Sequence, residues 1–363
     1  MLENKKVLIL SESDKYSANV MRCMVGSGAE LFLMGLPDSN ARIRNSSIFS
    51  GFISSCQSYK ADNQNENIQK ILKAIEEEGI DIISPSDYES FLFLAEYRQT
   101  LDGNCAVIPL PSIEEINRLD DKEICCKFVD GLNIDIPETL YVEGVSDLNE
   151  EDLIGFGYPI IVKTARGAGG EGVKLVDDYK GIRAFVEENK GTVLIQKYID
   201  GVDYCFNAFV VAGEIKAWSI FRYVYFDNTG SRGQFVEFLD DKEIYGLSVK
   251  ICTESQYTGP IVIDFRKDNK TSKVNFIEVN PRFGNNTCYS LVDGVNFFDV
   301  GFKLALNDNF SLSPDCLGVW SCSLKRLFTA PIRKLDLYSI GLIFKVGIPQ
   351  IFKVRKQNNL LFK

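Results

Sequence analysis

Three polar residues alternate with two apolar ones in the segment F-I-E-V-N-P-R-F, and their types suit a metal ion beside a phosphate. The polar positions are Glu278, Asn280 and Arg282. Side chains of a strand point to opposite faces with a period of two, so these groups would share one face. Ile277 and Val279 would then pack behind that face. Carboxylate and amide oxygens are ligands for Mg²⁺, and a guanidinium binds phosphoryl oxygens.

A further carboxylate precedes this segment. Asp264 ends the apolar run G-P-I-V-I-D, and the polar stretch 267–273 follows it. Two strands joined by such a turn form a hairpin, which would bring Asp264 next to Glu278. A hairpin whose polar face only meets solvent would give the same pattern, so this alternative stays open.

A glycine-rich loop follows a buried strand earlier in the chain. The sequence Y-P-I-I-V-K-T-A-R-G-A-G-G-E-G predicts a strand over 160–162 that leads into Lys163, and a return strand over 173–176. The loop glycines are Gly167, Gly169, Gly170 and Gly172. Glycine allows backbone conformations in which N–H groups converge on phosphate oxygens, and lysine adds a positive charge. The G-K-[ST] pattern of a Walker loop is absent. A plain glycine-rich hairpin is the alternative, but it does not explain the lysine.

With these segments the chain resembles the ATP-grasp superfamily, and in particular its carbamoyl-phosphate-synthase-like and D-aspartate-ligase-like branch. The resemblance covers the chain from its first strand to about residue 310, and five motifs occur in the family's order. It implies an α/β protein with α+β lobes, namely an ATP-grasp fold preceded by a Rossmann-like pre-ATP-grasp domain. It also implies ATP and one or two Mg²⁺ ions as cofactors.

The resemblance assigns roles residue by residue. The residues implied to contact ATP lie in motifs for phosphate, adenine or ribose: Lys122, Lys163, Gly167, Gly169, Gly170, Gln196, Lys197, Ile199 and Asp203. The residues implied to hold metal are Asp264, Glu278 and Asn280. Arg282, beside the transferred phosphate, and Lys163 are implied to be catalytic. Most family members have glutamate where this chain has Gln196 and Asp203, and both replacements keep an oxygen acceptor.

The organisation of the chain follows from these motifs. Strands expected at 7–10, 31–34, 81–84 and 107–109 alternate with helices near 16–25, 67–78 and 90–98, which predicts a parallel sheet. We expect four regions: the Rossmann-like domain 1–110, a lobe with the glycine loop 111–190, a lobe with hinge and metal site 191–310, and a basic segment 311–363. The run Ser84-Pro85-Ser86-Asp87 could face the site, although a turn with a helix N-cap is favoured.

Composition limits the classes of function. Apolar residues make up 45% of the 363 residues and charged residues 25%, which indicates a globular protein with two to three lobes. No apolar run is long enough for a membrane span or signal peptide, and the ten cysteines form no C-x-x-C pair. We therefore expect a cytoplasmic protein with reduced thiols. The chain contains no histidine, which excludes histidine bases, Ser-His or Cys-His nucleophiles and phosphohistidine.

Charge is distributed unevenly. The net charge is −10, which argues against nucleic acid as a partner, yet residues 323–363 carry nine basic residues and one acidic residue. This basic, partly apolar tail could contact an anionic membrane peripherally. Packing on the acidic body or in an oligomer interface, such as that of a homodimer, is the favoured interpretation.

The predicted function is that of an ADP-forming carboxylate–amine ligase acting through an acyl phosphate on small-molecule substrates, with an amino acid or a cell-envelope precursor as a reasonable guess. Arg222 and Arg232 could hold a substrate carboxylate or could be surface charges. One alternative is an enzyme that forms an acyl phosphate in the manner of carbamoyl phosphate synthase. A nucleotide-binding regulatory module without turnover is another.

Overall fold

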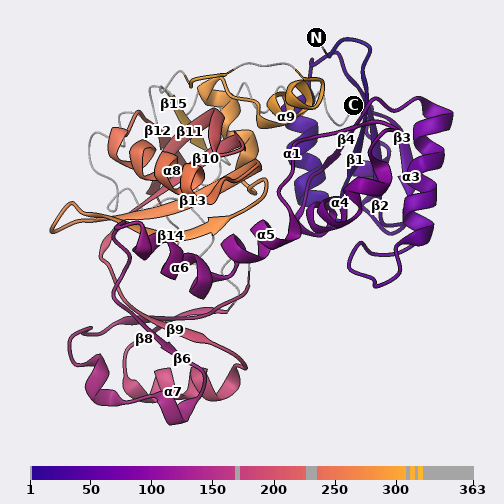
Figure 1. Ribbon diagram of the computed structural model, residues 1–363. Coiled ribbons are helices and arrows are strands. Elements are labelled where there is room, and N and C mark those ends of the chain that lie inside the picture. The colour runs from indigo at the N-terminus through magenta and orange to yellow at the C-terminus, as the bar shows by residue number, and fades with distance from the viewer. Residues whose placement is uncertain (1, 168–171, 226–234, 308–310, 315–317, 322–363) are drawn as a thin grey trace.

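Three β-sheets organise the computed structural model (Figure 1). The structure describes residues 2–167, 172–225, 235–307, 311–314 and 318–321. The basic tail 323–363 and Arg232, for which we predicted contacts, lie outside these residues. Within the described part, no helix combines the length and the apolar character that crossing a bilayer would require.

The N-terminal domain is a parallel sheet flanked by helices, as the alternating pattern predicted. Its strand order is β3-β2-β1-β4-β5. The elements are β1 (Lys6–Leu10), α1 (Asp14–Met24), β2 (Glu30–Gly35), α2 (Ala41–Arg44), β3 (Phe49–Ser54), α3 (Asn65–Glu78), β4 (Ile82–Pro85), α4 (Tyr88–Leu101) and β5 (Ala106–Val107). The sequence F-S-G-F-I-S of β3 lacks a clear period, which is why this edge strand and the short α2 were not predicted.

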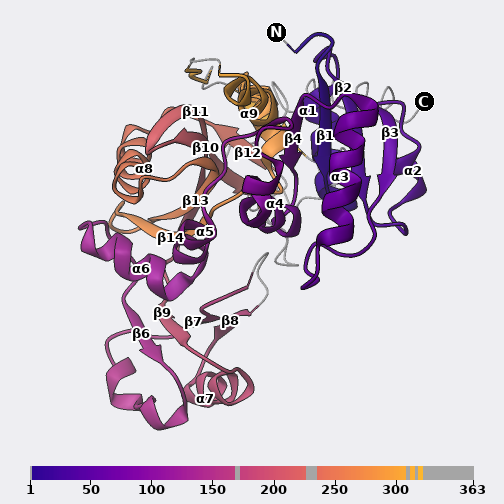
Figure 2. The same ribbon diagram turned by 45° about the vertical axis from the view of Figure 1, so that its right-hand side comes forward.

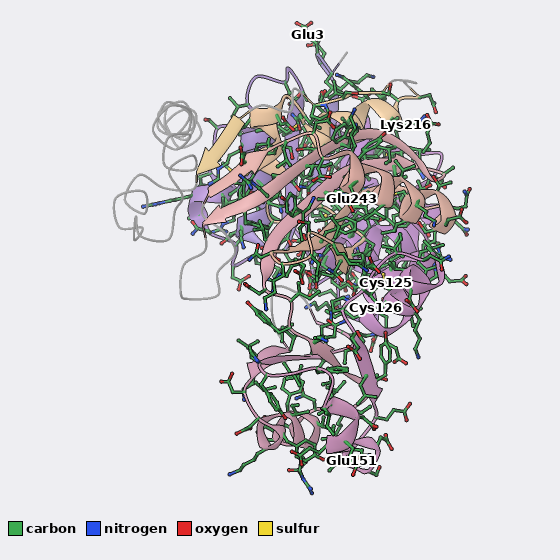
Figure 3. The ribbon with its side chains drawn as sticks, turned by 90° about the vertical axis from the view of Figure 1, so that its left-hand side faces the viewer. Glu3, Cys125, Cys126, Glu151, Lys216 and Glu243 are labelled. Atoms are coloured by element: carbon green, nitrogen blue, oxygen red, sulfur yellow. The ribbon has the colours of Figure 1, made fainter. Side chains whose placement is uncertain are left out.

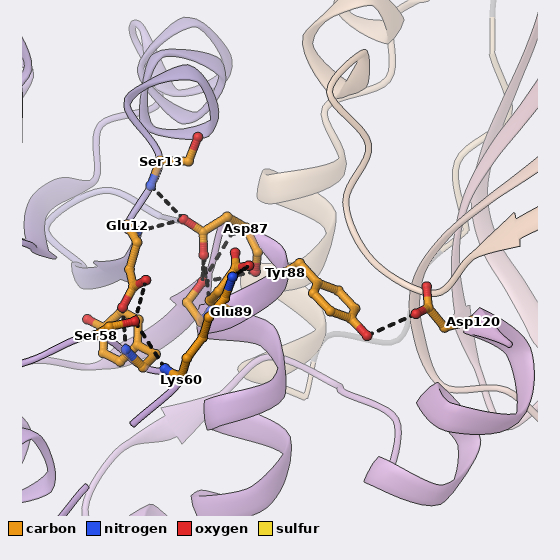
Figure 4. Close-up of polar contacts among 10 residues, drawn as sticks. Glu12, Ser13, Ser58, Lys60, Asp87, Tyr88, Glu89 and Asp120 are labelled. Carbon is orange, nitrogen blue, oxygen red and sulfur yellow. Dashed lines mark hydrogen bonds and ion pairs between the residues drawn. The ribbon is translucent and has the colours of Figure 1, made fainter. Parts of the chain in front are cut away.

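Asp87 begins α4 and ties it to the loop after β1 (Figure 4). Its Oδ1 accepts a hydrogen bond from the backbone N–H of Ser90 at 3.0 Å, which forms a capping box. Its Oδ2 accepts the N–H groups of Glu12 at 2.6 Å and Ser13 at 2.8 Å. The predicted N-cap is confirmed, and this carboxylate also fixes the carboxyl end of β1.

Two consecutive helices connect this domain to the rest of the chain: α5 (Ile113–Asp120) and α6 (Lys122–Gly131). The side chain of Asp121 accepts the N–H groups of Glu123 and Ile124 and so caps α6. Helix α6 packs against β14 of the large sheet. In Figures 1 and 2 both helices lie between the three sheets.

A small lobe carries the glycine loop. Its sheet has the order β6-β9-β7-β8. The elements are β6 (Thr139–Val142), η1 (Val145–Asp147), η2 (Glu150–Leu153), β7 (Ile160–Thr164), β8 (Val173–Val176), α7 (Tyr179–Glu188) and β9 (Val193–Lys197). Figure 3 shows this lobe extending from the body, with Glu151 at its far end. Because β9 pairs with both β6 and β7, our expected boundary at 190/191 falls inside this lobe.

The large lobe is a six-stranded sheet of order β14-β13-β10-β11-β12-β15. Its elements are β10 (Gly201–Val211), β11 (Glu214–Tyr225), β12 (Phe235–Phe238), α8 (Lys242–Ser255), β13 (Gly259–Asp268), β14 (Val274–Asn280), η3 (Thr287–Asp293), α9 (Phe297–Ala305) and β15 (Gly318–Ser321). One face buries Phe206, Ile263 and Phe265 in a core shared with α8. The opposite face carries Asp264 and Glu278 at one end and packs against η3 further along.

We predict that Asp87→Ala destabilises the N-terminal domain by about 2–4 kcal/mol, because the helix cap is lost and several buried N–H groups lose their acceptor. Urea unfolding followed by circular dichroism measures the change. Asp102→Ala is the matched control, since this residue ends the same helix and pairs with Arg98 at the surface. Equal stability of the two variants would contradict the role given to Asp87.

Candidate active site

The two predicted metal carboxylates are cross-strand neighbours. Asp264 on β13 lies directly opposite Glu278 on β14 in the antiparallel hairpin, so the sequence-based pairing is confirmed. Side chains at such positions lie about 5 Å apart at their Cβ atoms. Both residues line one pocket between the small and large lobes. Two carboxylates so close together repel each other when both are charged, and a cation beside them would relieve this repulsion.

A register shift at this point changes one detail of the prediction. The pairing moves between Asp264 and Phe265, so β14 carries an extra residue there. We expected Ile277 to pack behind the sheet, but it lines the pocket together with Glu278. Val279 does pack in the core behind. The bulge also frees the carbonyl of Ile277, which accepts a hydrogen bond from Lys163 Nζ at 3.4 Å.

Asn280 and Arg282 continue from the carboxylates towards the N-terminal domain. Asn280 Nδ2 donates to Glu278 Oε1 at 3.3 Å, and its Oδ1 accepts Arg282 Nη2 at 2.8 Å. Arg282 Nη1 donates to the hydroxyl of Tyr16 at 3.2 Å. The guanidinium carbon lies 5.8 Å from the ring centre of Tyr88. Neither Asn280 nor Arg282 is part of the pocket lining, so they lie just beyond it.

Tyr88 is a contribution from α4 that the sequence did not reveal. Its hydroxyl donates to Asp120 Oδ2 at 2.9 Å, as Figure 4 shows. Burial and the nearby Asp120 raise the pKa of this phenol, so it stays neutral. The ring therefore offers its face to Arg282 while its hydroxyl is held by α5.

The two predicted phosphate lysines approach from different elements. Lys122 stands at the start of α6, and its Nζ donates to the carbonyl of Gly167 at 2.8 Å. Lys163 is buried at the end of β7. Burial lowers the pKa of Lys163, while the charge of Glu278 acts to raise it. A phosphate beside Lys163 would favour the charged form of the lysine and so offset the effect of burial on its pKa.

The glycine loop has the backbone that the sequence suggested at the ends that are described. Gly167 has φ 141° and Gly172 has φ 70°, both in the region that favours glycine. A Cβ at Gly172 would also collide with Thr164 Oγ1. Gly169 and Gly170 lie outside the described residues. The loop thus leaves and rejoins the strands β7 and β8 through two positions that need glycine.

The hinge residues form the other end of the pocket. Gln196, Lys197, Ile199 and Asp203 all line it. The strand β9 ends at Lys197, and β10 begins at Gly201. Gln196 Nε2 donates to Thr139 Oγ1 at 2.8 Å, so the amide that replaces the family's glutamate is held by a neighbouring strand.

Arg266 is a site residue that the sequence analysis missed. Its guanidinium binds Asp203 with Nε at 2.5 Å from Oδ1 and Nη2 at 2.9 Å from Oδ2, and Nη1 donates to the carbonyl of Ile199 at 3.3 Å. Arg266 stands two residues after Asp264 on the same strand. The strand period could therefore have placed it on the same face. It orients the carboxylate that we expected to meet ribose.

The arginine proposed for the substrate carboxylate is placed elsewhere. Arg222 Nε donates to Glu237 Oε2 at 2.7 Å, in a pair across β11 and β12. Its neighbour Tyr223 lines the pocket, and adjacent residues of a strand point to opposite faces. Arg222 therefore does not face the site, and of our two alternatives the structure agrees with a charge on the hairpin rather than with a substrate contact.

Two cysteines lie beneath the phosphate lysines. Cys125 and Cys126 are buried on α6, near the junction of the lobes (Figure 3). Burial raises the pKa of Cys126, although Lys163 and Lys122 act in the opposite direction. These thiols stay protonated and serve as packing groups. All eight cysteines among the described residues are free.

One pocket thus collects residues from both lobes and from α6. The predicted residues that line it are Lys122, Lys163, Gly167, Gln196, Lys197, Ile199, Asp203, Asp264 and Glu278. The described residues contain no group of three or more acidic, cysteine or histidine side chains placed to hold a metal ion. The donor set at the carboxylate end is therefore two carboxylates with the amide of Asn280, a hard oxygen set that fits Mg²⁺.

Comparison with known proteins agrees with this arrangement. Residues 119–286 match the ATP-grasp domain. The carbamoyl phosphate synthase large chain of Clostridium perfringens is 25% identical over 54% of this chain and 19% of its own length. The D-alanine–D-alanine ligase of Bacillus anthracis is 28% identical over 38% of this chain and 50% of its own. The chain thus spans at most half of these relatives.

The fold is also shared with a solved structure. The biotin carboxylase–beta-gamma-ATP complex from Campylobacter jejuni superposes with a TM-score of 0.66 at 20% identity, over 88% of this chain and 75% of that one. This likeness extends the match beyond the ATP-grasp domain to the N-terminal sheet. Residues 119–286 thus match the ATP-grasp domain, and the fold of most of the chain is similar to that of this biotin carboxylase.

Proposed function

We propose that the protein is an ATP-dependent, ADP-forming carboxylate–amine ligase that acts through an acyl phosphate. The observation that carries this proposal is the single pocket in which Lys122, Lys163 and Gly167 face Asp264 and Glu278. Cations with a glycine loop suit phosphates, and paired carboxylates suit the metal that accompanies them. The matches to ATP-grasp ligases support the same reaction class.

The nucleotide would lie along the pocket from the hinge to the carboxylates. The backbone around Lys197 and Ile199 offers groups to the adenine edge, and Asp203 offers its carboxylate to ribose. Because Arg266 holds both oxygens of Asp203, the ribose hydroxyls would use the remaining lone pairs. Lys122 and Lys163 would then contact the phosphates.

Asp264, Glu278 and Asn280 would hold one or two Mg²⁺ ions. Bound there, the metal would neutralise the phosphate oxygens as charge shifts during transfer. To bind a metal, the Oδ1 atom of Asn280 must share or lose the hydrogen bond that it accepts from Arg282 Nη2 at 2.8 Å. Arg282 is thereby positioned one step beyond the metal carboxylates.

The chain's own residues then position reactants rather than exchange protons. A substrate carboxylate oxygen attacks the γ-phosphorus of ATP, the bond to the β-phosphate oxygen breaks, and ADP leaves. Arg282 offsets the charge of the acyl phosphate. The amine then attacks the acyl carbon, inorganic phosphate leaves, and the amine loses a proton. Phosphoryl transfer of this kind depends mainly on positioning and charge, which agrees with a chain that contains no histidine.

The small-molecule carboxylate and amine are the proposed partners of the protein. The free cysteines support a cytoplasmic setting.

The match to carbamoyl phosphate synthase favours a second candidate, an enzyme that releases or passes on the acyl phosphate. The two candidates differ in whether steady turnover needs an amine.

Replacement of Lys163 by methionine should weaken binding of Mg-ATP about tenfold to a hundredfold, because a charge-assisted contact to phosphate is lost. The fold should persist, since burial already disfavours this charge. Isothermal titration calorimetry gives the dissociation constant. Lys174→Met, at an exposed position of the neighbouring strand β8, is the control and should bind as the parent does. Unchanged affinity in Lys163→Met would remove this residue from the site.

Glu278→Gln should lower turnover by about two orders of magnitude or more and raise the Mg²⁺ concentration for half-maximal rate. The shape is kept while one negative charge is lost from the metal set. The rate of ADP release is measured against Mg²⁺ concentration. Glu254→Gln, at an exposed position of α8, is the control. A parent-like Mg²⁺ dependence in Glu278→Gln would place the metal elsewhere.

The products identify the reaction. ATP should yield ADP and phosphate, and hydroxylamine in place of the amine should give a hydroxamate, because the acyl carbon is electrophilic. Chromatography of the nucleotides and the ferric hydroxamate colour report both products. AMP and pyrophosphate would indicate adenylation and contradict the proposal. Steady ADP release without any amine would favour the second candidate.

A further inference from the structure

The face of the large sheet that carries the metal carboxylates continues past them. On β10 the residues Asp203, Cys205 and Asn207 follow one another at every second position and share this face. Asp264 lies opposite Cys205, and Val262 lies opposite Asn207. Asn207 therefore stands one step, about 7 Å, beyond the carboxylate row on the side away from the ribose end.

Four buried polar residues gather at this step, and we call them the polar cluster: Asn207, Ser219, Asn286 and Asp293. Ser219 lies opposite Asn207 on β11, and its Oγ donates to Asp293 Oδ2 at 3.1 Å. Asn286 Nδ2 and Asn207 Nδ2 both donate to Cys205 Sγ, at 3.4 Å and 3.7 Å. The segment of Asn286 and η3 thus covers the sheet here and closes the cluster from outside.

Two oxygens of the polar cluster have no donor. Asn207 is 2% exposed and Asn286 is 6% exposed, and within the described residues the Oδ1 atom of each has no hydrogen-bond partner. A buried acceptor without a donor costs about 1–3 kcal/mol, so such atoms normally meet a ligand or water. Asp293, fully buried, adds a carboxylate to the same group. Two amide oxygens and a carboxylate together suit a ligand group with several N–H donors and a positive charge.

The polar region ends abruptly. The next residue of β10 on this face is Phe209, whose ring lies 6.4 Å from that of Phe283. Phe283 in turn stacks on Phe298 at 4.2 Å. The ligand group at the cluster is therefore small, because an apolar wall stands directly behind it.

We propose that the polar cluster binds the ammonium group of the carboxylate substrate, so that this substrate is an amino acid. The inference rests on the ligase function proposed above and names its substrate class. From the cluster, the carboxylate of a small amino acid extends back towards Asn280 and Arg282, where phosphoryl transfer would occur. Asn280 shares its row with Asn207, because both lie opposite Val262.

The cluster suits the phosphorylated substrate better than the attacking amine. An amine beside the Oδ1 atoms of Asn207 and Asn286 and near the carboxylate of Asp293 would be held as an ammonium ion, which has no free lone pair and cannot attack the acyl carbon. Protonation of this group therefore prevents the substrate from reacting with itself. Bicarbonate and simple carboxylates would leave the acceptors unfilled.

The first test compares amino acids with their deamino analogues. Hydroxamate formation is measured with Mg-ATP and hydroxylamine, using the L- and D-forms of alanine, aspartate and glutamate beside propionate, succinate and glutarate. Binding of the same compounds is followed by thermal shift with a non-hydrolysable ATP analogue. We expect at least one amino acid to bind and react while its deamino analogue does neither.

Variants of Asn207 then locate the contact. Asn207→Leu should raise the KM of the reactive amino acid about tenfold or more, because an acceptor to a charged donor is lost, and should leave the dissociation constant of Mg-ATP within twofold. Asn207→Asp keeps an oxygen acceptor and should restore the KM. Asn275→Leu, a buried asparagine on β14 outside the cluster, is the matched control and should keep the parent KM.

The outcomes separate this inference from the ligase proposal. Equal use of alanine and propionate, or an unchanged KM in Asn207→Leu, would overturn the ammonium subsite while leaving the ligase intact. Binding of an amino acid that depends on Asn207 without any ADP release would support the subsite and contradict the ligase. Failure of every amino acid to bind would overturn the subsite. A stronger defect in Asn207→Asp than in Asn207→Leu would show that the cluster recognises an anion, and would overturn it as well.

Discussion

The site depends on placing two carboxylates side by side without losing the fold. Asp264 and Glu278 lie opposite each other on a hairpin, where like charges are unfavourable unless a cation balances them. Lys163 reaches this pair from the small lobe, and its ammonium binds the carbonyl that the bulge exposes at Ile277. This contact joins the two lobes beside the carboxylate pair, and a metal with phosphates would strengthen the same charge balance.

The strands β7, β13 and β14 carry the candidate site residues Lys163, Asp264 and Glu278, and β8 follows the glycine loop. Each of these strands could be predicted from its run of apolar residues. Local patterns also revealed the glycine loop, because spacing and residue type determine it. The alternating strands and helices of the N-terminal domain predicted its parallel sheet for the same reason.

Features that depend on long-range contacts were not predicted. The bulge at Ile277 arises from the pairing of two strands, and the single-strand period placed this side chain on the wrong face. Arg266 and Asp203 are far apart in sequence and meet only because β13 pairs with β10. The residue type of Arg222 suits a substrate carboxylate, but the alternation of side chains along β11 places it next to Glu237. In these cases the pairing register of the strands, more than residue type, determined where the side chains lie.

The N-terminal domain is tied to the chemistry through Arg282. Within the described residues this guanidinium forms no ion pair; it contacts the hydroxyl of Tyr16, the ring of Tyr88 and the amide of Asn280. A buried arginine held by neutral groups keeps its positive charge available for an anion. Because Tyr16 and Tyr88 come from α1 and α4, the parallel sheet that fixes these helices also fixes the arginine. The first domain is therefore a structural part of the candidate site, and in the proposed reaction its position would determine where an incoming carboxylate lies.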